Sequence, residues 1–142
     1  MCYNGVGMGD FSEVEHIADR ALRVRGRDMA ELLVNAARGM GSLLVPHLDG
    51  ISSDTERRFD LEAFDSEGLL VEWLSELAYL AEMEMLVFRE FDMLRVSPTR
   101  LLAVGRGTHV PALQEQIKAV TYHNLEIVQM DPGLEATVVF DV

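Results

Sequence analysis

Two aspartates near opposite ends of the 142-residue chain, Asp19 and Asp141, are the side chains best suited to bind a cation. Successive side chains of a strand point to opposite faces, so Asp141 in a terminal strand would share a face with Val139. A carboxylate among apolar neighbours is costly unless a cation or hydrogen-bond donors compensate its charge. With a backbone or terminal oxygen of Val142, the two carboxylates would form an oxygen-only site, which selects Ca²⁺ or Mg²⁺. The alternative is that Asp19 caps a turn and Asp141 is solvated.

Three further side chains are candidates for contact with a partner or a phosphate: Lys118, His16 and His123. Lys118, the one lysine among 12 basic residues, is either such a contact or an ordinary surface charge. In a predicted strand over 117–130, His123 shares a face with Leu125 and is expected to be a core histidine rather than a catalyst. His16 could orient a neighbouring loop or lie near the cation, and the structural role is favoured.

Two helices are expected to position these residues. Asp28 has the residue type of a helix N-cap with Glu31 as its capping-box partner, and the apolar residues of 29–44 follow a helical repeat with one buried stripe. Asp65 or Ser66 is expected to cap the second helix. The inner face of that helix is predicted to comprise Leu70, Trp73, Leu74, Leu77, Leu80 and Ala81.

Strands are predicted where apolar and polar residues alternate or where short apolar runs end at turn residues. The ranges are 14–25, 57–63, 86–96, 101–107, 117–130 and 134–142. Two helices among mostly hairpin-connected strands predict an α+β fold, a two-layer domain with two helices packed on a mostly antiparallel sheet. The glycine-rich residues 1–11 are expected to form a flexible arm, and residues 12–142 a single domain.

The composition restricts the classes of partner. The formal net charge is −12, whereas a protein that binds RNA by itself usually carries a basic face. Direct high-affinity binding of nucleic acid is therefore not expected, and a cation or a basic protein partner is favoured. A single cysteine, Cys2, favours a reducing, cytoplasmic location. The most apolar stretch, residues 69–86, is interrupted by glutamates and is not expected to cross a membrane.

Three segments of the chain resemble a known family. They are Glu15-His16-Ile17-Ala18-Asp19, Lys118-Ala119-Val120-Thr121-Tyr122-His123 and Val138-Val139-Phe140-Asp141-Val142. In this order, with two amphipathic helices between them, they are similar to the archease family over about residues 12–142. Residues 68–77 also resemble the family's second helix, with Ser75 where asparagine is expected.

This resemblance implies a function and a set of site residues. Archeases are accessory proteins of the GTP-dependent ligase that joins RNA ends in tRNA splicing and RNA repair. They promote the ligase's guanylyl-histidine intermediate and support multiple turnover, so the chain is expected to be an activator and not itself an enzyme. Asp19, Asp141 and Val142 match the positions of the family's metal ligands, and the family's fold agrees with the predicted one.

The sequence departs from the family pattern next to Asp19. Ile17 stands where the family usually has threonine, and Arg20-Ala21 replaces an aliphatic residue and glycine. Altered neighbours of a metal ligand can cost about 10–100-fold in metal affinity. Arg20 could also compete with a cation for the carboxylates.

Two other functions stay open at the level of the sequence. A metal-dependent hydrolase could use the same carboxylates, although no evident general base accompanies them and two ligands are few for metal catalysis. A chaperone-like adaptor with broader clients is the other alternative. The oligomeric state is left open.

Overall fold

The structure, a computed structural model, describes residues 10–15 and 19–142. The elements in chain order are β2 (Phe11–Glu15), β3 (Asp19–Gly26), α1 (Met29–Leu44), the short 3-10 helix η1 (Leu48–Gly50), β4 (Thr55–Glu62), α2 (Ser66–Glu84), β5 (Leu86–Val96), β6 (Arg100–His109), β7 (Ala119–Thr121), β8 (Val128–Gln129) and β9 (Leu134–Asp141). Neither α-helix in this described part is long and apolar enough to cross a membrane.

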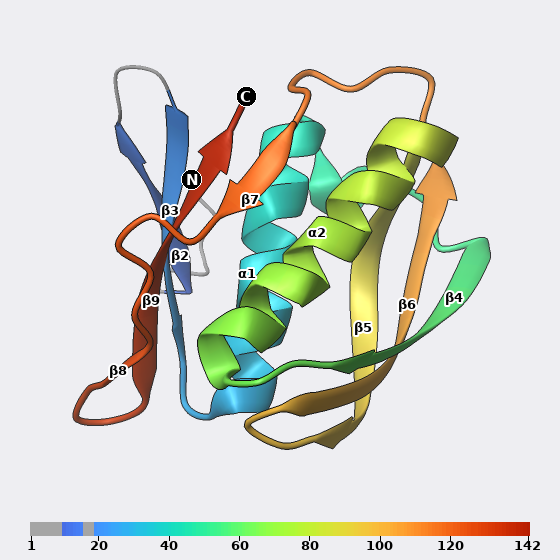
Figure 1. Ribbon diagram of the computed structural model, residues 1–142. Coiled ribbons are helices and arrows are strands. Elements are labelled where there is room, and N and C mark those ends of the chain that lie inside the picture. Colours follow the sequence, from blue (N-terminus) through green and yellow to red (C-terminus); the bar gives the residue numbers. More distant parts are fainter. Residues whose placement is uncertain (1–9, 16–18) are drawn as a thin grey trace.

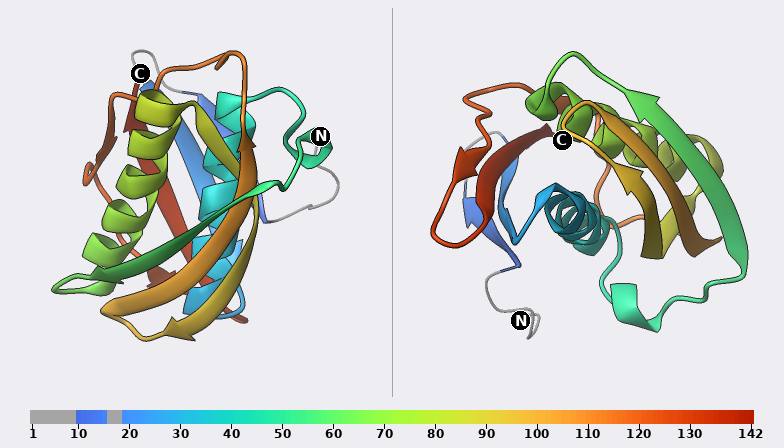
Figure 2. Two further views of the ribbon diagram at one scale, coloured as in Figure 1. Left: turned by 90° about the vertical axis from the view of Figure 1, so that its right-hand side faces the viewer. Right: turned by 90° about the horizontal axis from the view of Figure 1, so that it is seen from below.

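The strands form two antiparallel sheets with the helices between them (Figure 1). One sheet has the order β2-β3-β9-β7, with β8 also pairing to β9, and the other has the order β4-β6-β5. Helix α1 contacts β3 of the first sheet and β5 of the second, and α2 contacts β7 on one side and β4 and β5 on the other (Figure 2). The predicted α+β class, with two helices packed on mostly antiparallel strands, is confirmed. The prediction named a single sheet, whereas the structure divides the strands into two sheets.

Helix α1 begins at the predicted cap. The Asp28 carboxylate accepts a hydrogen bond of 2.9 Å from the backbone N–H of Glu31, and the Glu31 carboxylate accepts one from the backbone N–H of Arg27. The predicted buried stripe is confirmed and is wider than expected, and the partly exposed residues Val34, Arg38 and Ser42 lie together on the remaining side of the helix. A wide buried face suits a helix that lies between two sheets, and Gly39 allows close approach to Leu22 and Phe11. The buried residues are Leu32, Leu33, Asn35, Ala36, Ala37, Gly39, Met40, Gly41, Leu43 and Leu44.

The cap of α1 predicts a dependence of stability on pH. The guanidinium and backbone N–H of Arg27 lower the pKa of Glu31 below its ordinary value. A lowered folded-state pKa stabilises the protein above the unfolded pKa, about 4.3 for glutamate, and the gain is lost as pH falls through the folded value. Glu31→Gln is therefore expected to cost about 1 kcal/mol or less at pH 7, since the pair is partly exposed.

The measurement is urea unfolding of wild type and Glu31→Gln at several pH values between 7 and about 3. The difference between the two curves should shrink toward acid pH. A difference that stays constant or grows as the pH falls contradicts the role assigned to this carboxylate.

Helix α2 is capped by Asp65, whose carboxylate accepts a hydrogen bond of 2.7 Å from the backbone N–H of Gly68. All six residues predicted for its inner face are buried. The helix ends where Met85 adopts the left-handed conformation with φ 56°. Trp73 donates its indole N–H to the carbonyl of Leu33 at 2.9 Å and so joins α2 to α1.

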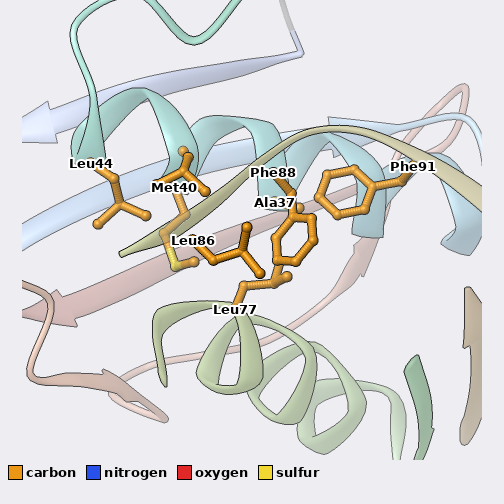
Figure 3. Close-up of a pocket in the computed structure, with 9 residues that line it drawn as sticks. Ala37, Met40, Leu44, Leu77, Leu86, Phe88 and Phe91 are labelled. Atoms are coloured by element: carbon orange, nitrogen blue, oxygen red, sulfur yellow. The ribbon is translucent and has the colours of Figure 1, made fainter. Parts of the chain in front are cut away.

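The interior between α1, α2 and β5 is filled by apolar side chains. Figure 3 shows Met40, Leu77 and Leu86 among the residues that surround a small cavity there. Its volume is about 10 Å³, close to the smallest space that holds one water, and its walls offer no polar side chain. This cavity is a packing defect of the core and not a ligand site.

The predicted strand over 117–130 is interrupted in the structure. Of this predicted strand, only the parts that form β7 and β8 pair with β9, because the segment between them turns away from the sheet. The N–H of Leu125 donates to the carbonyl of Tyr122, Asn124 is left-handed with φ 52°, and the N–H of Ile127 donates to the Glu67 carboxylate of α2 at 2.9 Å. The other predicted strands correspond to β4, β5, β6 and β9 within a few residues.

The prediction of one strand over 14–25 is wrong, because Val14 and Glu15 belong to β2 and the rest of the described range belongs to β3. Strand β2 pairs antiparallel with β3, from Phe11 opposite Val24 to Glu15 opposite Arg20. Of the predicted arm, residues 1–9 lie outside the described residues. Phe11 belongs to β2 and packs against the core.

Candidate metal-binding site

Asp19 and Asp141 stand directly opposite each other in the first sheet. In the antiparallel register of β3 and β9, Asp19 is the partner of Asp141 and Arg20 is the partner of Phe140. Side chains of directly opposed residues lie on the same face of a sheet, with Cβ atoms about 4.5–5.5 Å apart. Asp19 opens β3 and Asp141 ends β9, so the pair lies at the end of the sheet where the C label stands (Figure 1).

This pairing places two like charges at one cross-strand position, which destabilises a sheet. The Asp19 side chain is partly buried and the Asp141 side chain is exposed. A cation on the common face would be attracted to both carboxylates and would relieve the repulsion between them. The geometry therefore brings together the two side chains that the sequence singled out.

The backbone around Asp141 is held on both sides. Its carbonyl accepts a hydrogen bond of 2.7 Å from the N–H of Lys118, and Ala119 is its register partner on β7. The side chain of Val142 packs partly against the core, which fixes the backbone that follows Asp141. The backbone of Lys118 is thus hydrogen-bonded next to the carboxylate pair, and the Lys118 side chain is exposed.

Arg20 does not take the place of a cation between the two aspartates. Its guanidinium forms ion pairs with Glu13 of β2 and with Glu115, the latter at 3.0 Å. Alternation along β3 places Arg20 on the opposite face of the sheet from Asp19. The hydrogen bonds that its guanidinium donates to the carboxylates of Glu13 and Glu115 raise the pKa of Arg20 above its ordinary value.

The loop between β6 and β7 is attached to three elements by three successive residues. The N–H of Gln114 donates to the carbonyl of Leu44 at the end of α1. Glu115 pairs with Arg20 of β3, and Gln116 donates to the Glu82 carboxylate of α2 at 2.8 Å. These contacts fix the path of the chain toward Lys118. These contacts could not be predicted from the sequence, because each partner is distant along the chain.

The two histidines of the prediction have different outcomes. His123 is exposed, and its Nε2 lies 3.3 Å from the side-chain nitrogen of Asn124, so the expected core position is wrong. The left-handed turn at Asn124 carries this segment off the sheet and into solvent. His16, together with Ile17, lies outside the described residues.

The donor set fits a hard cation. Both side chains are carboxylates, and backbone oxygens of the adjoining strand ends are the nearest additional donors. Among the described residues, no group of three His, Cys, Asp or Glu side chains forms a self-sufficient metal cage. A cation bound here would keep several waters, as Mg²⁺ and exposed Ca²⁺ sites do. Zinc prefers nitrogen and sulfur ligands, which the two aspartates do not supply.

Fold and site together define a small α+β protein that presents a pair of carboxylates at one end of a sheet. The sequence model of the Archease protein family (MTH1598/TM1083) matches residues 11–142. The chain belongs to the archease family.

Relatives with similar sequences agree with this assignment. Protein archease of Methanosarcina barkeri is 36% identical over 140 residues, covering 93% of this chain and 95% of the relative. Protein archease of Methanopyrus kandleri is 30% identical over 139 residues, covering 93% and 99%.

Two solved structures share the fold. The solution structure of Methanobacterium thermoautotrophicum protein 1598 superposes with a TM-score of 0.76 at 26% identity, covering 95% of this chain and all of the other. The crystal structure of a Thermotoga maritima archease, described as a "possible chaperone", has a TM-score of 0.64 at 23% identity, covering 92% and 96%.

Proposed function

We propose that this protein activates a GTP-dependent RNA ligase of the RNA-splicing or RNA-repair type, promoting guanylylation of the ligase and its multiple turnover. The observation that carries the proposal is the register of β3 and β9, which opposes Asp19 and Asp141 on one face. Membership of the archease family supports the choice of partner. The proposal makes the chain an accessory protein of the cytoplasm and not an enzyme.

The carboxylate pair supplies the mechanism. Asp19 and Asp141, with a backbone oxygen of Val142, would hold one Ca²⁺ or Mg²⁺ ion, which supplies positive charge that a nucleotide phosphate can share. The end of the sheet that bears them docks at the metal-loaded active site of the ligase. Lys118, exposed beside Asp141, is suited to contact a phosphate or an acidic surface of the ligase. An effect on ligase conformation requires tighter binding to the activated state than to the resting state.

The overall charge supports a protein partner over RNA itself. The net charge of −12 repels a phosphate backbone. Asp19 and Asp141 add negative charge at the end of the sheet that is proposed to dock. The RNA is therefore expected to contact the ligase, and this protein to contact the ligase alone.

The test is guanylylation of a purified cognate ligase by GTP, with this protein present at substoichiometric concentration. Wild type is expected to stimulate the reaction, and Asp19→Asn and Asp141→Asn are expected to lose stimulation by about 10-fold or more, in line with lost metal-site residues. Asp54→Asn is the matched control, because Asp54 is an exposed aspartate of the loop before β4, in the other sheet.

Circular dichroism and thermal unfolding would establish that the variants are folded. Full stimulation by both folded site variants contradicts the carboxylate mechanism, and no stimulation by wild type contradicts activation of the ligase. Nucleotide hydrolysis without any ligase would support the hydrolase alternative. Suppression of aggregation of unrelated proteins would support the chaperone-like alternative.

A further inference from the structure

We propose that a groove at the opposite end of the molecule from Asp19 and Asp141 binds a segment of the partner ligase in which an apolar side chain adjoins lysine or arginine. The inference rests on the proposed function, and it assigns a second contact to the same partner. The groove has a volume of about 540 Å³. Its lining residues are Asp28, Met29, Ala30, Ser66, Glu67, Val96, Ser97, Pro98, Ile127, Gln129 and Leu134.

The groove is separate from the carboxylate pair. It lies where α1 and α2 begin and where the β5–β6 and β8–β9 turns meet them, the lower end of the molecule in Figure 1. Strand β9 runs from Leu134, which lines the groove, to Asp141. Eight strand residues span about 23 Å from first to last. A ligase that reaches both sites therefore contacts both ends of this sheet.

The floor of the groove is apolar and comes from several elements. Met29, Val96, Ile127 and Leu134 are each only partly buried, and they are contributed by α1, β5, the segment before β8, and β9. Apolar surface gathered in a concave site is characteristic of interaction sites, whereas single exposed apolar residues are ordinary. The shape suits the insertion of one or two side chains of a partner.

Phe64 lies two residues before Ser66, which lines the groove, and the Phe64 side chain is fully exposed, at 104%. The backbone on either side of it is fixed. The N–H of Ala63 donates to Thr99 at 2.9 Å, the Asp65 carboxylate caps α2, and the Ser66 hydroxyl donates to Pro98 at 2.9 Å.

A phenylalanine just before a helix cap often packs onto the first turn of its own helix as a hydrophobic staple. Phe64 is too exposed to do so, and its ring contributes nothing to the core. Because the backbone around Phe64 is held, only the torsions of its own side chain lose freedom when a partner covers it. Aromatic side chains of this kind are frequent energetic centres of protein interfaces.

The charge of the groove selects the chemistry of the partner. Among its lining residues, which all belong to the described part of the chain, there are the carboxylates of Asp28 and Glu67 and no lysine or arginine. Asp65 adds a third carboxylate between Phe64 and Ser66. Each of the three accepts a hydrogen bond from a backbone N–H. A basic group beside the inserted apolar side chain would complement this arrangement.

A second copy of this chain fits the groove less well. Each copy carries a net charge of −12, and the segment around Phe64 is itself acidic, with Glu62, Asp65 and Glu67. Docking this segment of one copy into the groove of another would bring like charges together, which costs free energy. The acidic groove therefore favours a partner of the opposite charge.

The test separates binding from activation in the purified complex of this protein with the ligase. Phe64→Ser is expected to raise the dissociation constant about 10-fold or more, the effect of removing a side chain that dominates an interface. The concentration that gives half-maximal stimulation should rise by the same factor. Ala30→Lys, which places a cation in the groove, should weaken binding too. Both variants should reach wild-type stimulation at saturation, whereas Asp141→Asn should lower the maximum.

Tyr79→Ser is the matched control, because Tyr79 is an exposed aromatic residue of α2, at 58%, that does not line the groove. Unchanged dissociation constants for both Phe64→Ser and Ala30→Lys, with stimulation by wild type intact, overturn the groove assignment and leave the proposed function standing. No binding of wild type to the ligase overturns both. Stronger wild-type binding at low salt than at high salt is expected from the acidic groove, and salt-independent binding contradicts its role in selecting a basic segment.

Discussion

Calcium at about 100 times its dissociation constant is expected to raise the free energy of unfolding of the wild-type protein by about 2.7 kcal/mol. Any ligand that binds only the folded state stabilises it, and the opposed carboxylates of Asp19 and Asp141 exist as a pair only when β3 and β9 are in register. Magnesium should act in the same direction. Urea unfolding after removal of divalent ions, with and without added calcium, measures this gain.

The effect of Asp141→Asn on the free energy of unfolding is expected to depend on whether metal is present. In the absence of metal, it removes the repulsion between two like charges at one cross-strand position, and it should stabilise the protein by about 0.2–1 kcal/mol. In the presence of calcium, it should lose most of the metal-dependent gain. Asp54→Asn should behave like wild type in both conditions. An equal calcium response of wild type and Asp141→Asn would exclude this pair as the cation site.

Replacing Trp73 by alanine is expected to destabilise the protein by about 3–5 kcal/mol, the range for deletion of a buried tryptophan side chain. Trp73 has no exposed surface, and its ring meets those of Phe59 and Phe91 edge to face at centroid distances of 5.1 and 5.2 Å. The substitution also removes the hydrogen bond to Leu33 that links the two helices. It therefore affects both helices and, through Phe59 of β4 and Phe91 of β5, the β4-β6-β5 sheet.

The measurement is urea unfolding followed by circular dichroism, because Trp73 is the sole tryptophan and its loss removes the fluorescence signal. Trp73→Phe should fall between wild type and Trp73→Ala, since it keeps an aromatic ring but not the indole N–H. Tyr79→Ala, an exposed site of the same helix, should stay within about 0.5 kcal/mol of wild type. A loss below about 1 kcal/mol for Trp73→Ala would show that the site collapses around the missing ring.

The local features of the fold could be predicted from the sequence because their causes are local. The caps at Asp28 and Asp65 act on the N–H group three residues away, and the buried face of α2 follows from the spacing of apolar residues along one helix. The alternation of side chains in β9 likewise depends only on neighbouring residues. The family resemblance and the α+β class both follow from signals of this kind.

Some errors arose where a distant group changed a local preference. The segment after Thr121 has the composition of a strand, yet the Glu67 carboxylate draws the N–H of Ile127 away from the sheet. His123 is exposed because the left-handed turn at Asn124 carries this segment off the sheet. By sequence, Arg20 could compete with a cation for the aspartates because it follows Asp19. In the structure, Glu115 of a later loop pairs with Arg20 on the other face of the sheet.

The sequence by itself determined which residues carry charge at this site, and the tertiary structure decided that they meet. Asp19 and Asp141 are brought together by the register of β3 and β9, which depends on the packing of Leu22 and Phe140 against the helices. The exposure of Phe64 beside an acidic groove likewise depends on turns that are far apart in the chain. Side-chain type and helical or strand periodicity are properties of short segments. Register, sheet membership and surface grooves are set by the free energy of the whole core, which a short segment does not contain.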